Sequence, residues 1–279
     1  MQPYELSFEF GGYDCLKEFG LTWVPDSVNL SLSVERNEYE IAGAPGTVLY
    51  EGKKLKTGKI KGTLYALNAD EATLANQSRI CFMLQRVVSL LKSGRKPLTF
   101  PYLDGTYYLA QVDDELNWSY KSFIDGGLPI TFTVQPYRYL NYLNEASGTT
   151  LTTSLSIDLR LDGDSPAPLC AKIVNKGLKK IADAQLTLSG KSYSFEGVDL
   201  ETGDSLTISG EAPIDAIITR GNVNTSALNK ITAFDEVSLQ PGANSVSAVI
   251  AYGSDSANGA AYTNQTEAEI SLWARGRFE

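Results

Sequence analysis

The side chains that carry most enzyme chemistry are few in this 279-residue sequence, and their spacing does not suit catalysis. Histidine is absent, which excludes Ser-His-Asp and Cys-His catalysis, HExxH zinc sites and histidine general bases. Cys15, Cys81 and Cys170 lie far apart, and their odd number and wide spacing give neither a disulfide framework nor a CxxC metal motif. Only carboxylate, lysine or tyrosine chemistry would remain for an enzyme.

The nearest approach to a catalytic pair is the acidic run Asp113-Asp114-Glu115. Paired carboxylates perform acid–base chemistry in glycosidases, so a glycosidase centred on this run is the lowest-ranked hypothesis. Adjacent residues on an extended chain point to opposite faces, and no other part of the sequence predicts a sugar cleft. A solvated turn is the favoured interpretation, and we predict no catalytic residues.

No motif predicts a cofactor or a metal ion. Glycine pairs such as Gly126-Gly127 do not form the GxGxxG or GxxxxGK[ST] patterns of nucleotide-binding loops, and the acidic residues lack EF-hand spacing. A net charge of −9 argues against a protein held on nucleic acid by phosphate contacts. No apolar run approaches the ~18 residues that span a bilayer. We therefore expect no cofactor, no metal, no specific nucleic acid and no membrane insertion.

Trp273 offers the strongest binding chemistry. Alternation along its predicted strand places Ser271, Trp273 and Arg275 on one face and apolar residues on the other. An exposed tryptophan beside an arginine could stack on a sugar or anchor a partner protein. A strand covered on both faces would instead bury Trp273, and the sequence gives the two alternatives equal weight. The candidate contacts for a partner or a sugar are Tyr262, Trp273 and Arg275.

One long helix is predicted, from Asn68 to Gly94. Asn68 can cap its start with Glu71 as the reciprocal partner, and Gly94 can take the left-handed position after its end. Its apolar residues recur at steps of three, four or seven, which places them on one face. That face is predicted to lie on β-structure, and it consists of Leu74, Cys81, Leu84, Val88 and Leu91, widened by Ile80 and Val87.

Strands and turns surround this helix in the first half of the chain. Alternation around Gly11-Gly12 predicts a hairpin, and Val28–Val34 alternates as a strand. Asp104-Gly105 predicts a turn between two further strands. The strand Leu128–Val134 is expected to end, or to become an edge, at Pro136, because proline has no N–H for a ladder.

A long hairpin arm is predicted on either side of the turn Ala44-Pro45-Gly46. Lysines follow it at 53, 54, 56, 59 and 61, and we interpret them as a solvated face rather than a nucleic-acid patch. Contact with an acidic neighbouring subunit is an intermediate alternative. The candidate residues for an inter-subunit arm are Tyr39, Ile41, Val48 and Tyr50.

Composition shifts towards Thr, Ser, Gly and Asp between Asn144 and Pro168, which indicates a domain boundary. We predict an N-terminal domain at 1–147, a linker or connecting strand at 148–170, and a second domain at 171–279. The second domain has short predicted strands separated by turns such as Gly221-Asn222, a pattern typical of a β-sandwich. The predicted fold class is mainly β.

The order and spacing of several short motifs carry a family resemblance over nearly the whole chain. The opening SFEFGGYDCLKEFGL and the run from Lys96 to Tyr139 resemble the siphophage distal tail protein family, which includes prophage homologues. The second half resembles the galectin-like module of that family. The turn Pro45-Gly46-Thr47 departs from the family, which often carries a glycine-rich turn with an Asp there. The matching positions are Leu98, Phe100, Asp104, Tyr108, Ala110, Ile130, Phe132, Pro136 and Tyr137, then Asn175, Gly177, Gly203, Leu206, Thr207, Ile208, Phe234, Leu239, Pro241, Gly242 and Asn244.

This resemblance implies a structural virion protein rather than an enzyme. It implies an N-terminal tail-tube-like β-sandwich or barrel domain with one helix, followed by a C-terminal galectin-like β-sandwich. It also implies a homohexameric ring, the baseplate hub of the viral tail tip. Such a ring joins the tail-tube protein to the tail-associated lysin or central tail fibre, and carries receptor-binding proteins for host attachment.

Assembly in the host cytoplasm is expected, because the N-terminus has no basic flank followed by an apolar stretch. The alternative from another class is a carbohydrate-binding module for the host cell wall, acting through Trp273 or Tyr262. Galectin-type sugar sites rely on His together with Asn, Arg and Trp, and this chain has no His. Sugar binding is therefore the secondary hypothesis.

Overall fold

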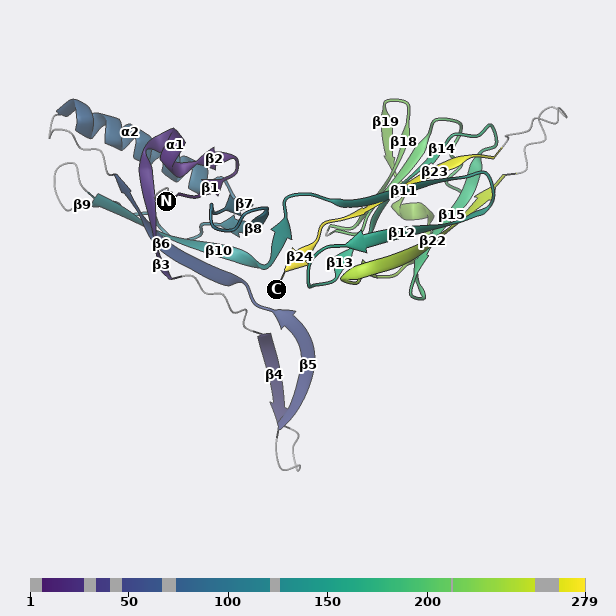
Figure 1. The fold of residues 1–279 in the computed structure, drawn as a ribbon, viewed down its shortest axis with the longest axis horizontal. Helices are drawn as coiled ribbons and strands as arrows, with labels where there is room; N and C mark the ends of the chain where they lie inside the picture. Colours follow the sequence, from purple (N-terminus) through teal and green to yellow (C-terminus); the bar gives the residue numbers. More distant parts are fainter. Residues whose placement is uncertain are drawn as a thin grey trace. The chain divides into compact units, whose positions relative to one another are not determined.

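The computed structural model describes residues 7–27, 34–40, 47–66, 74–120, 126–211, 213–253 and 266–278. The chain divides into two compact units, Met1–Asn141 and Tyr142–Phe278, and each unit has its own hydrophobic core (Figure 1). Strands make up most of both units, so the predicted mainly β class is confirmed.

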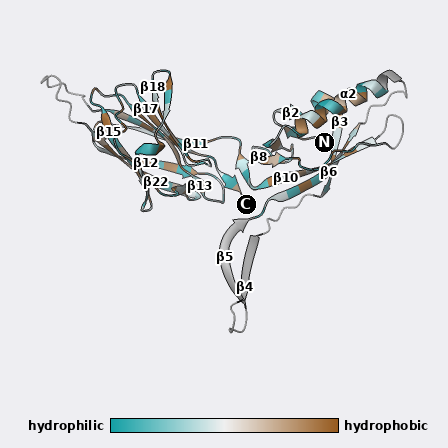
Figure 2. Cartoon of the chain, turned by 180° about the vertical axis from the view of Figure 1, so that it is seen from behind, coloured by the Kyte–Doolittle hydropathy of each residue, from teal (hydrophilic) through white to brown (hydrophobic). Residues whose placement is uncertain are grey.

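The first unit is built on an antiparallel sheet with strand order β2-β1-β7-β8-β10-β6-β3, and β9 pairs with the start of β10. Alternation sets its faces: Ile60 and Leu64 of β6 and Phe132 of β10 point into the core. Figure 2 shows hydrophobic and hydrophilic residues alternating along β6 and β10. The strands are β1 (Glu9–Phe10), β2 (Tyr13–Asp14), β3 (Leu21–Ser27), β4 (Val34–Glu40), β5 (Thr47–Leu55), β6 (Gly58–Ala66), β7 (Lys96–Thr99), β8 (Thr106–Gln111), β9 (Ser119–Tyr120) and β10 (Gly126–Leu140).

Strand β10 continues through Pro136, so the prediction that the strand ends or becomes an edge there is wrong. β6 flanks β10 on one side and β8 on the other. The register with β8 shifts between Val134 and Arg138. An irregularity of this kind accommodates proline inside a sheet, since a residue without an N–H is left out of the ladder.

Helix α2 (Leu74–Leu91) buries Ile80, Leu84, Val87 and Leu91, which follow one another at steps of four, three and four. Val87 and Leu91 belong to the core of the first unit, and Figure 1 shows α2 lying along one face of its sheet. Cys81 is exposed, so its predicted place on the buried face is wrong. The centre of that face lies on Ile80, and the next residue is turned about 100° away from it.

The end of α2 agrees with the sequence. Gly94 has a φ of +94°, the left-handed conformation expected after the last turn. Asn68 and Glu71, the predicted capping box, lie outside the described residues. Val28–Val34, except its last residue, also lies outside them.

A short helix, α1 (Cys15–Phe19), was not predicted. It follows the β1–β2 hairpin, whose expected turn at Gly11-Gly12 is confirmed by the pairing of Phe10 with Tyr13. Asp14 caps α1 by accepting hydrogen bonds from the N–H groups of Leu16 and Lys17. Partial burial acts to raise the pKa of Asp14, but these bonds and one from Ser7 outweigh it and lower the pKa.

The second unit stacks two antiparallel sheets, of order β11-β23-β14-β17-β18-β19 and β12-β22-β15-β16-β20. Their inward residues, such as Ile173, Leu206 and Val246, form one core. A small pair, β13–β21, completes the unit. Its elements are β11 (Asn144–Thr150), β12 (Ser154–Leu161), β13 (Ala167–Pro168), β14 (Cys170–Asn175), β15 (Ile181–Leu188), β16 (Lys191–Phe195), β17 (Ser205–Ser209), β18 (Asp215–Arg220), β19 (Val223–Ser226), η1 (Leu228–Lys230), β20 (Ile231–Phe234), β21 (Ser238–Leu239), β22 (Gly242–Tyr252), β23 (Ala268–Ala274) and β24 (Arg277–Phe278).

The boundary differs from the sequence prediction. The second unit begins at Tyr142, and the stretch 148–170, predicted as a linker or connecting strand, consists largely of strands: part of β11, all of β12 and β13, and the start of β14. Polar residues of β12 occupy its exposed face while Ile157, Leu159 and Leu161 enter the core. A half-exposed strand therefore has the Ser- and Thr-rich composition that indicated a linker.

Candidate functional site: surfaces for assembly

The predicted arm is a hairpin of β4 and β5. Tyr39 pairs with Val48 and Asn37 with Tyr50, while Ile41 is outside the described residues. Among the strands that the structure describes, β4 and β5 pair only with each other. An isolated two-stranded hairpin is at best marginally stable in water, so this element gains from a covering surface. The assignment of its side chains to an interface stays a prediction.

Lysines continue beyond the arm along β6. Lys59 and Lys61 are exposed on the face of β6 that points away from the core, and Ile60 between them is buried on the opposite face. Lys56, in the connection before β6, is also exposed. The described part of the run thus forms a solvated strand face, the favoured interpretation from the sequence, and it is available to an acidic partner.

Trp273 is half-buried, between the two alternatives that the sequence left open. The alternation along β23 is as predicted: Leu272 enters the core, and Ser271 and Trp273 face outward. Glu145 of β11 pairs directly with Trp273. Arg275 follows β23 and is half-buried, and Tyr262 lies outside the described residues. A shallow groove of about 270 Å³ lies beside the indole, lined by Glu145, Ala146, Ser147, Ser271, Leu272 and Trp273.

Three tyrosines of the first unit pack on one another, and Tyr102 stacks on Phe100. Tyr107 and Tyr139 are cross-strand partners, and their rings stack with centroids 5.6 Å apart. Tyr137 meets Tyr139 edge-on. In the second unit, Tyr142 is 48% exposed and donates a hydrogen bond to Asp162. The rings therefore stabilise the sheet, and Tyr142 presents a surface.

The thiols of Cys15 and Cys170 and the acidic run 113–115 are each explained by their structural surroundings. Burial raises the pKa of the Cys15 and Cys170 thiols, which keeps both protonated and unreactive at neutral pH. The run Asp113-Asp114-Glu115 is exposed, as expected of a solvated turn. Lys92 at the end of α2 donates to its backbone carbonyls, so the run also holds the helix end in place.

Asn175 and Asn244, two of the positions that carry the family resemblance, stabilise turns in the second unit. Asn175 is fully buried, and its side-chain amide donates to the carbonyls of Lys179 and Leu200 while its oxygen accepts from the Gly177 N–H. Asn244 donates to the Gln240 carbonyl and accepts from the same residue's N–H. These amides satisfy backbone groups and stabilise the loops, which explains their positions without a ligand.

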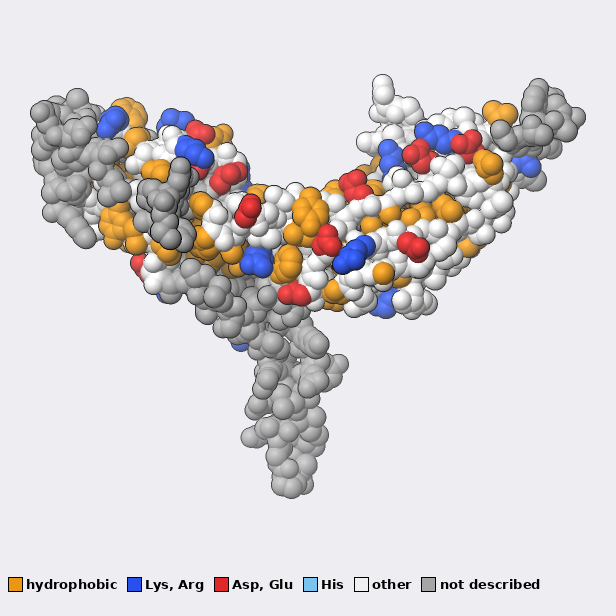
Figure 3. All heavy atoms as spheres, viewed as in Figure 1, with side chains coloured by type: hydrophobic (Ala, Val, Ile, Leu, Met, Phe, Trp, Pro, Cys, Tyr) orange, Lys and Arg blue, Asp and Glu red, His pale blue; other side chains and the backbone are white. Residues whose placement is uncertain are grey.

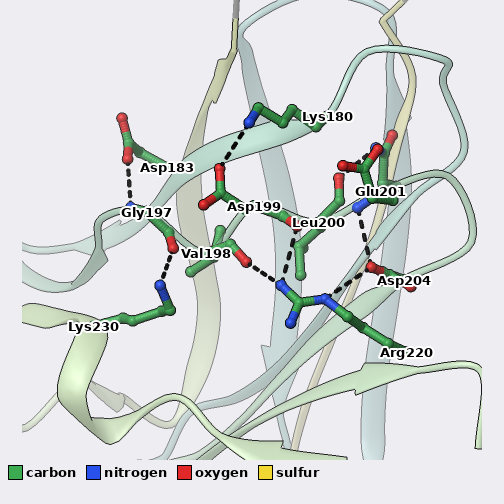
Figure 4. A network of polar contacts seen from close by, with 11 residues as sticks. Lys180, Asp183, Gly197, Val198, Asp199, Leu200, Glu201, Asp204, Arg220 and Lys230 are labelled. Atoms are coloured by element: carbon green, nitrogen blue, oxygen red, sulfur yellow. Dashed lines mark hydrogen bonds and ion pairs between the residues drawn. The ribbon is translucent and has the colours of Figure 1, made fainter. Parts of the chain in front are cut away.

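A polar network stabilises the 197–204 loop and the end of β18. Figure 4 shows Arg220 reaching this loop, where its guanidinium donates to the carbonyls of Val198 and Asp199 and to the Asp204 carboxylate. Lys180 forms an ion pair with Asp199, and Lys230 donates to the Gly197 carbonyl. The loop is therefore held from three neighbouring elements.

Within the described residues, no group of three or more His, Cys, Asp or Glu side chains is placed to hold a metal ion. No helix there has the length and apolar character needed to cross a bilayer. Figure 3 shows acidic and basic side chains scattered over the visible surface, without a single-sign field. The surface features that the structure describes are therefore the β4–β5 hairpin, the exposed lysines of β6 and the groove beside Trp273.

Comparison with solved structures finds the same fold in another protein. The SPP1 Dit (gp 19.1) protein, described as a paradigm of the hub adsorption apparatus in phages that infect Gram-positive bacteria, matches with a TM-score of 0.65. The match covers 96% of this chain and 98% of Dit at 13% identity. No protein-family model matches the chain, and no curated protein sequence gives a significant match. The likeness shows that both units of the chain share the Dit fold in the same order.

Proposed function

We propose that the chain is a structural component of a long-tailed phage tail tip. The observation that carries this proposal is the likeness to Dit, which spans nearly the full length of both chains. The sequence motifs indicate the same family independently of the fold. The chain would act as a hub in the virion, assembled in the host cytoplasm, and it would perform no catalysis.

We further propose that six copies form a ring through their first units. The β4–β5 hairpin supports this, because it lacks partner strands within the described chain and a neighbouring copy would supply a cover. One face of the ring would dock the tail-tube protein, and the other the tail-associated lysin or central fibre. The second unit, with the galectin-like role implied by the resemblance, would carry receptor-binding proteins.

Negative-stain electron microscopy with light scattering on the purified full-length chain tests the ring. Six chains of 30.3 kDa give a particle of about 182 kDa, and we expect a ring with six outward lobes. A variant with residues 35–54 replaced by a Gly-Ser linker should remain monomeric. A wild-type chain that stays monomeric even when mixed with the tail-tube protein and the lysin of the same phage would contradict the proposal.

A carbohydrate-binding role is the second candidate, favoured by the groove beside Trp273. The indole offers an apolar face, and Glu145, Ser147 and Ser271 offer hydrogen-bonding groups around it. Binding of the full chain to host cell-wall fractions, lost in Trp273→Ala and retained in Tyr142→Ala, would establish it. Tyr142 is the matched control because it is an exposed aromatic residue of the same unit. No binding to any wall fraction would exclude this role.

A further inference from the structure

Strand β19 extends beyond the sandwich core. All four of its residues, Val223 to Ser226, are exposed, whereas neighbouring β18 buries Ala216 and Ile218. Val223 is 61% exposed although it is apolar. β19 forms the outer edge of its sheet and, within the described chain, pairs only with β18. The hairpin therefore presents a strand whose residues are all exposed and whose outer edge has no partner in the described chain. Figure 1 shows β18 and β19 extending from the second unit.

The backbone geometry fixes which groups face that edge. The hairpin turns at Gly221-Asn222, and Gly221 has the positive φ of +56° that the first turn residue of a type II′ turn requires. Ala227 N–H donates to the Ala216 carbonyl, so hydrogen-bonded pairs fall on every second residue back to the turn. Val223 and Thr225 thus bond to β18, while Asn224 and Ser226 direct their N–H and C=O groups outward. The edge offers two donor–acceptor pairs about 7 Å apart.

The other edge strands of the two sandwich sheets carry or adjoin charged residues. β12 contains Asp158 and Arg160, β11 contains Glu145, and β20 lies between Lys230 and Asp235. Charges on an edge are a common protection against pairing with another chain. β19 has none, and Figure 3 shows no charged side chain at the projecting tip of its hairpin. Arg220, the last residue of β18 before the turn, hydrogen-bonds to the 197–204 loop and so holds the hairpin against it.

We propose that β19 is a docking site for an extended segment of another protein, which adds to the sheet as one more strand. Only an extended backbone matches the outward groups of Asn224 and Ser226. A second copy pairing β19 with β19 would join only four residues a side, whereas a separate extended segment can continue past the strand. Exposed Ile214 and Leu228 near the hairpin base lengthen the surface for a longer strand. The partner segment is uncharged, with small or β-branched side chains opposite Val223.

This inference does not rest on the tail-tip role, and its test uses the full chain alone. The probe is a short synthetic peptide of alternating threonine and valine with one lysine at each end. Hydrogen exchange is followed by NMR on the isotope-labelled protein. We expect the Asn224 and Ser226 amides to exchange at least about tenfold more slowly with peptide, and the Val223 and Thr225 amides, already bonded to β18, to change little. Unchanged exchange at both residues near saturating peptide solubility would overturn the proposal.

A matched pair of variants separates strand addition from general stickiness. Val223→Lys places a charge on the edge and should abolish the slowing. Val249→Lys changes an equally apolar exposed residue on β22, within the other sheet, and should preserve it. Both substitutions are at exposed positions and should leave the melting temperature near that of the wild type. Retained slowing in Val223→Lys, or equal slowing at the β11, β12 and β20 edges, would also overturn the proposal.

Discussion

Arg220 and Asp204 form an ion pair in which the arginine Nε lies 3.2 Å from the carboxylate Oδ2. The Asp204 side chain is only 11% exposed, and its Oδ2 also accepts a hydrogen bond from the Glu201 N–H. Arg220 ends β18, whereas Asp204 directly precedes β17. One side chain thus links the projecting hairpin to the loop that leads into the neighbouring strand.

Replacing Arg220 tests this link. Arg220→Ala removes the ion pair and two charged hydrogen bonds to the carbonyls of Val198 and Asp199. Since the arginine side chain is 45% exposed, solvent screens part of the interaction, and we expect a loss of about 1 kcal/mol in the free energy of unfolding. Urea denaturation measures it. Arg220→Lys should recover only part of the loss, because one ammonium cannot reproduce the fork; full recovery would show that charge alone suffices.

Asp14 supports α1 in a pH-dependent way. Its folded-state pKa lies below the ordinary value of 3.8, so the carboxylate stabilises the fold above that value. The contribution is lost as the pH falls through the lowered pKa. Asp14→Ala removes the helix cap and should cost about 1 kcal/mol at neutral pH, with a smaller difference in acid. Urea midpoints of both proteins across the acid range measure it, and a pH-independent difference would contradict the charged cap.

The absence of a side chain at Gly62 leaves room for the Trp23 ring in the core of the first unit. A Cβ added at Gly62 would contact the Trp23 ring and lie 2.6 Å from the Val24 carbonyl oxygen, across the β3–β6 ladder. Trp23 is 1% exposed and cannot withdraw into solvent. Gly62→Ala should therefore destabilise the first unit by about 1–3 kcal/mol through overpacking. Lys61→Ala, at an exposed position on the same strand, should stay within about 0.5 kcal/mol of wild type. A neutral Gly62→Ala would show that β3 can shift.

Local periodicity predicted much of this fold. The face of α2 was found to within one residue, and the error at Cys81 arose because Ile80 and Cys81 both fit a broad apolar stripe. α1 was missed because five residues are too few for a periodic signal, although Asp14 and Gly20 supply cap residues. The N-cap residue Asp14 was the sequence signal from which this helix could have been predicted.

Non-local contacts decided the features that the sequence could not supply. Whether β10 ends at Pro136 depends on the register with β8, which is far away in sequence. The exposure of Trp273 depends on what covers the outer face of β23, and alternation specifies only which face it occupies. The open edge of β19 depends on which strand ends its own sheet in the described chain. No single-strand pattern contains that information.

Tyr193 is buried in the core of the second unit together with its hydroxyl group. Its ring is 1% exposed, and the hydroxyl donates towards the carbonyl oxygens of Leu169 and Val237, each 3.3 Å away. Tyr193→Phe keeps the ring contact with Phe234 but leaves both carbonyls without this donor. We expect a loss of about 1–2 kcal/mol in the free energy of unfolding at neutral pH.

The stability of Tyr193→Phe relative to wild type at alkaline pH gives a second test of the buried hydroxyl. Burial raises its pKa from 10 to about 12, so the folded protein retains the neutral phenol while the unfolded chain ionises from pH 10 upwards. A raised folded-state pKa means that the stabilisation is complete below pH 10 and is lost as the pH rises towards 12. The advantage of wild type over Tyr193→Phe in urea midpoint should therefore shrink across this window. An advantage that stays constant to pH 12 would mean that the hydroxyl ionises equally in both states, and the buried donor would have to be abandoned.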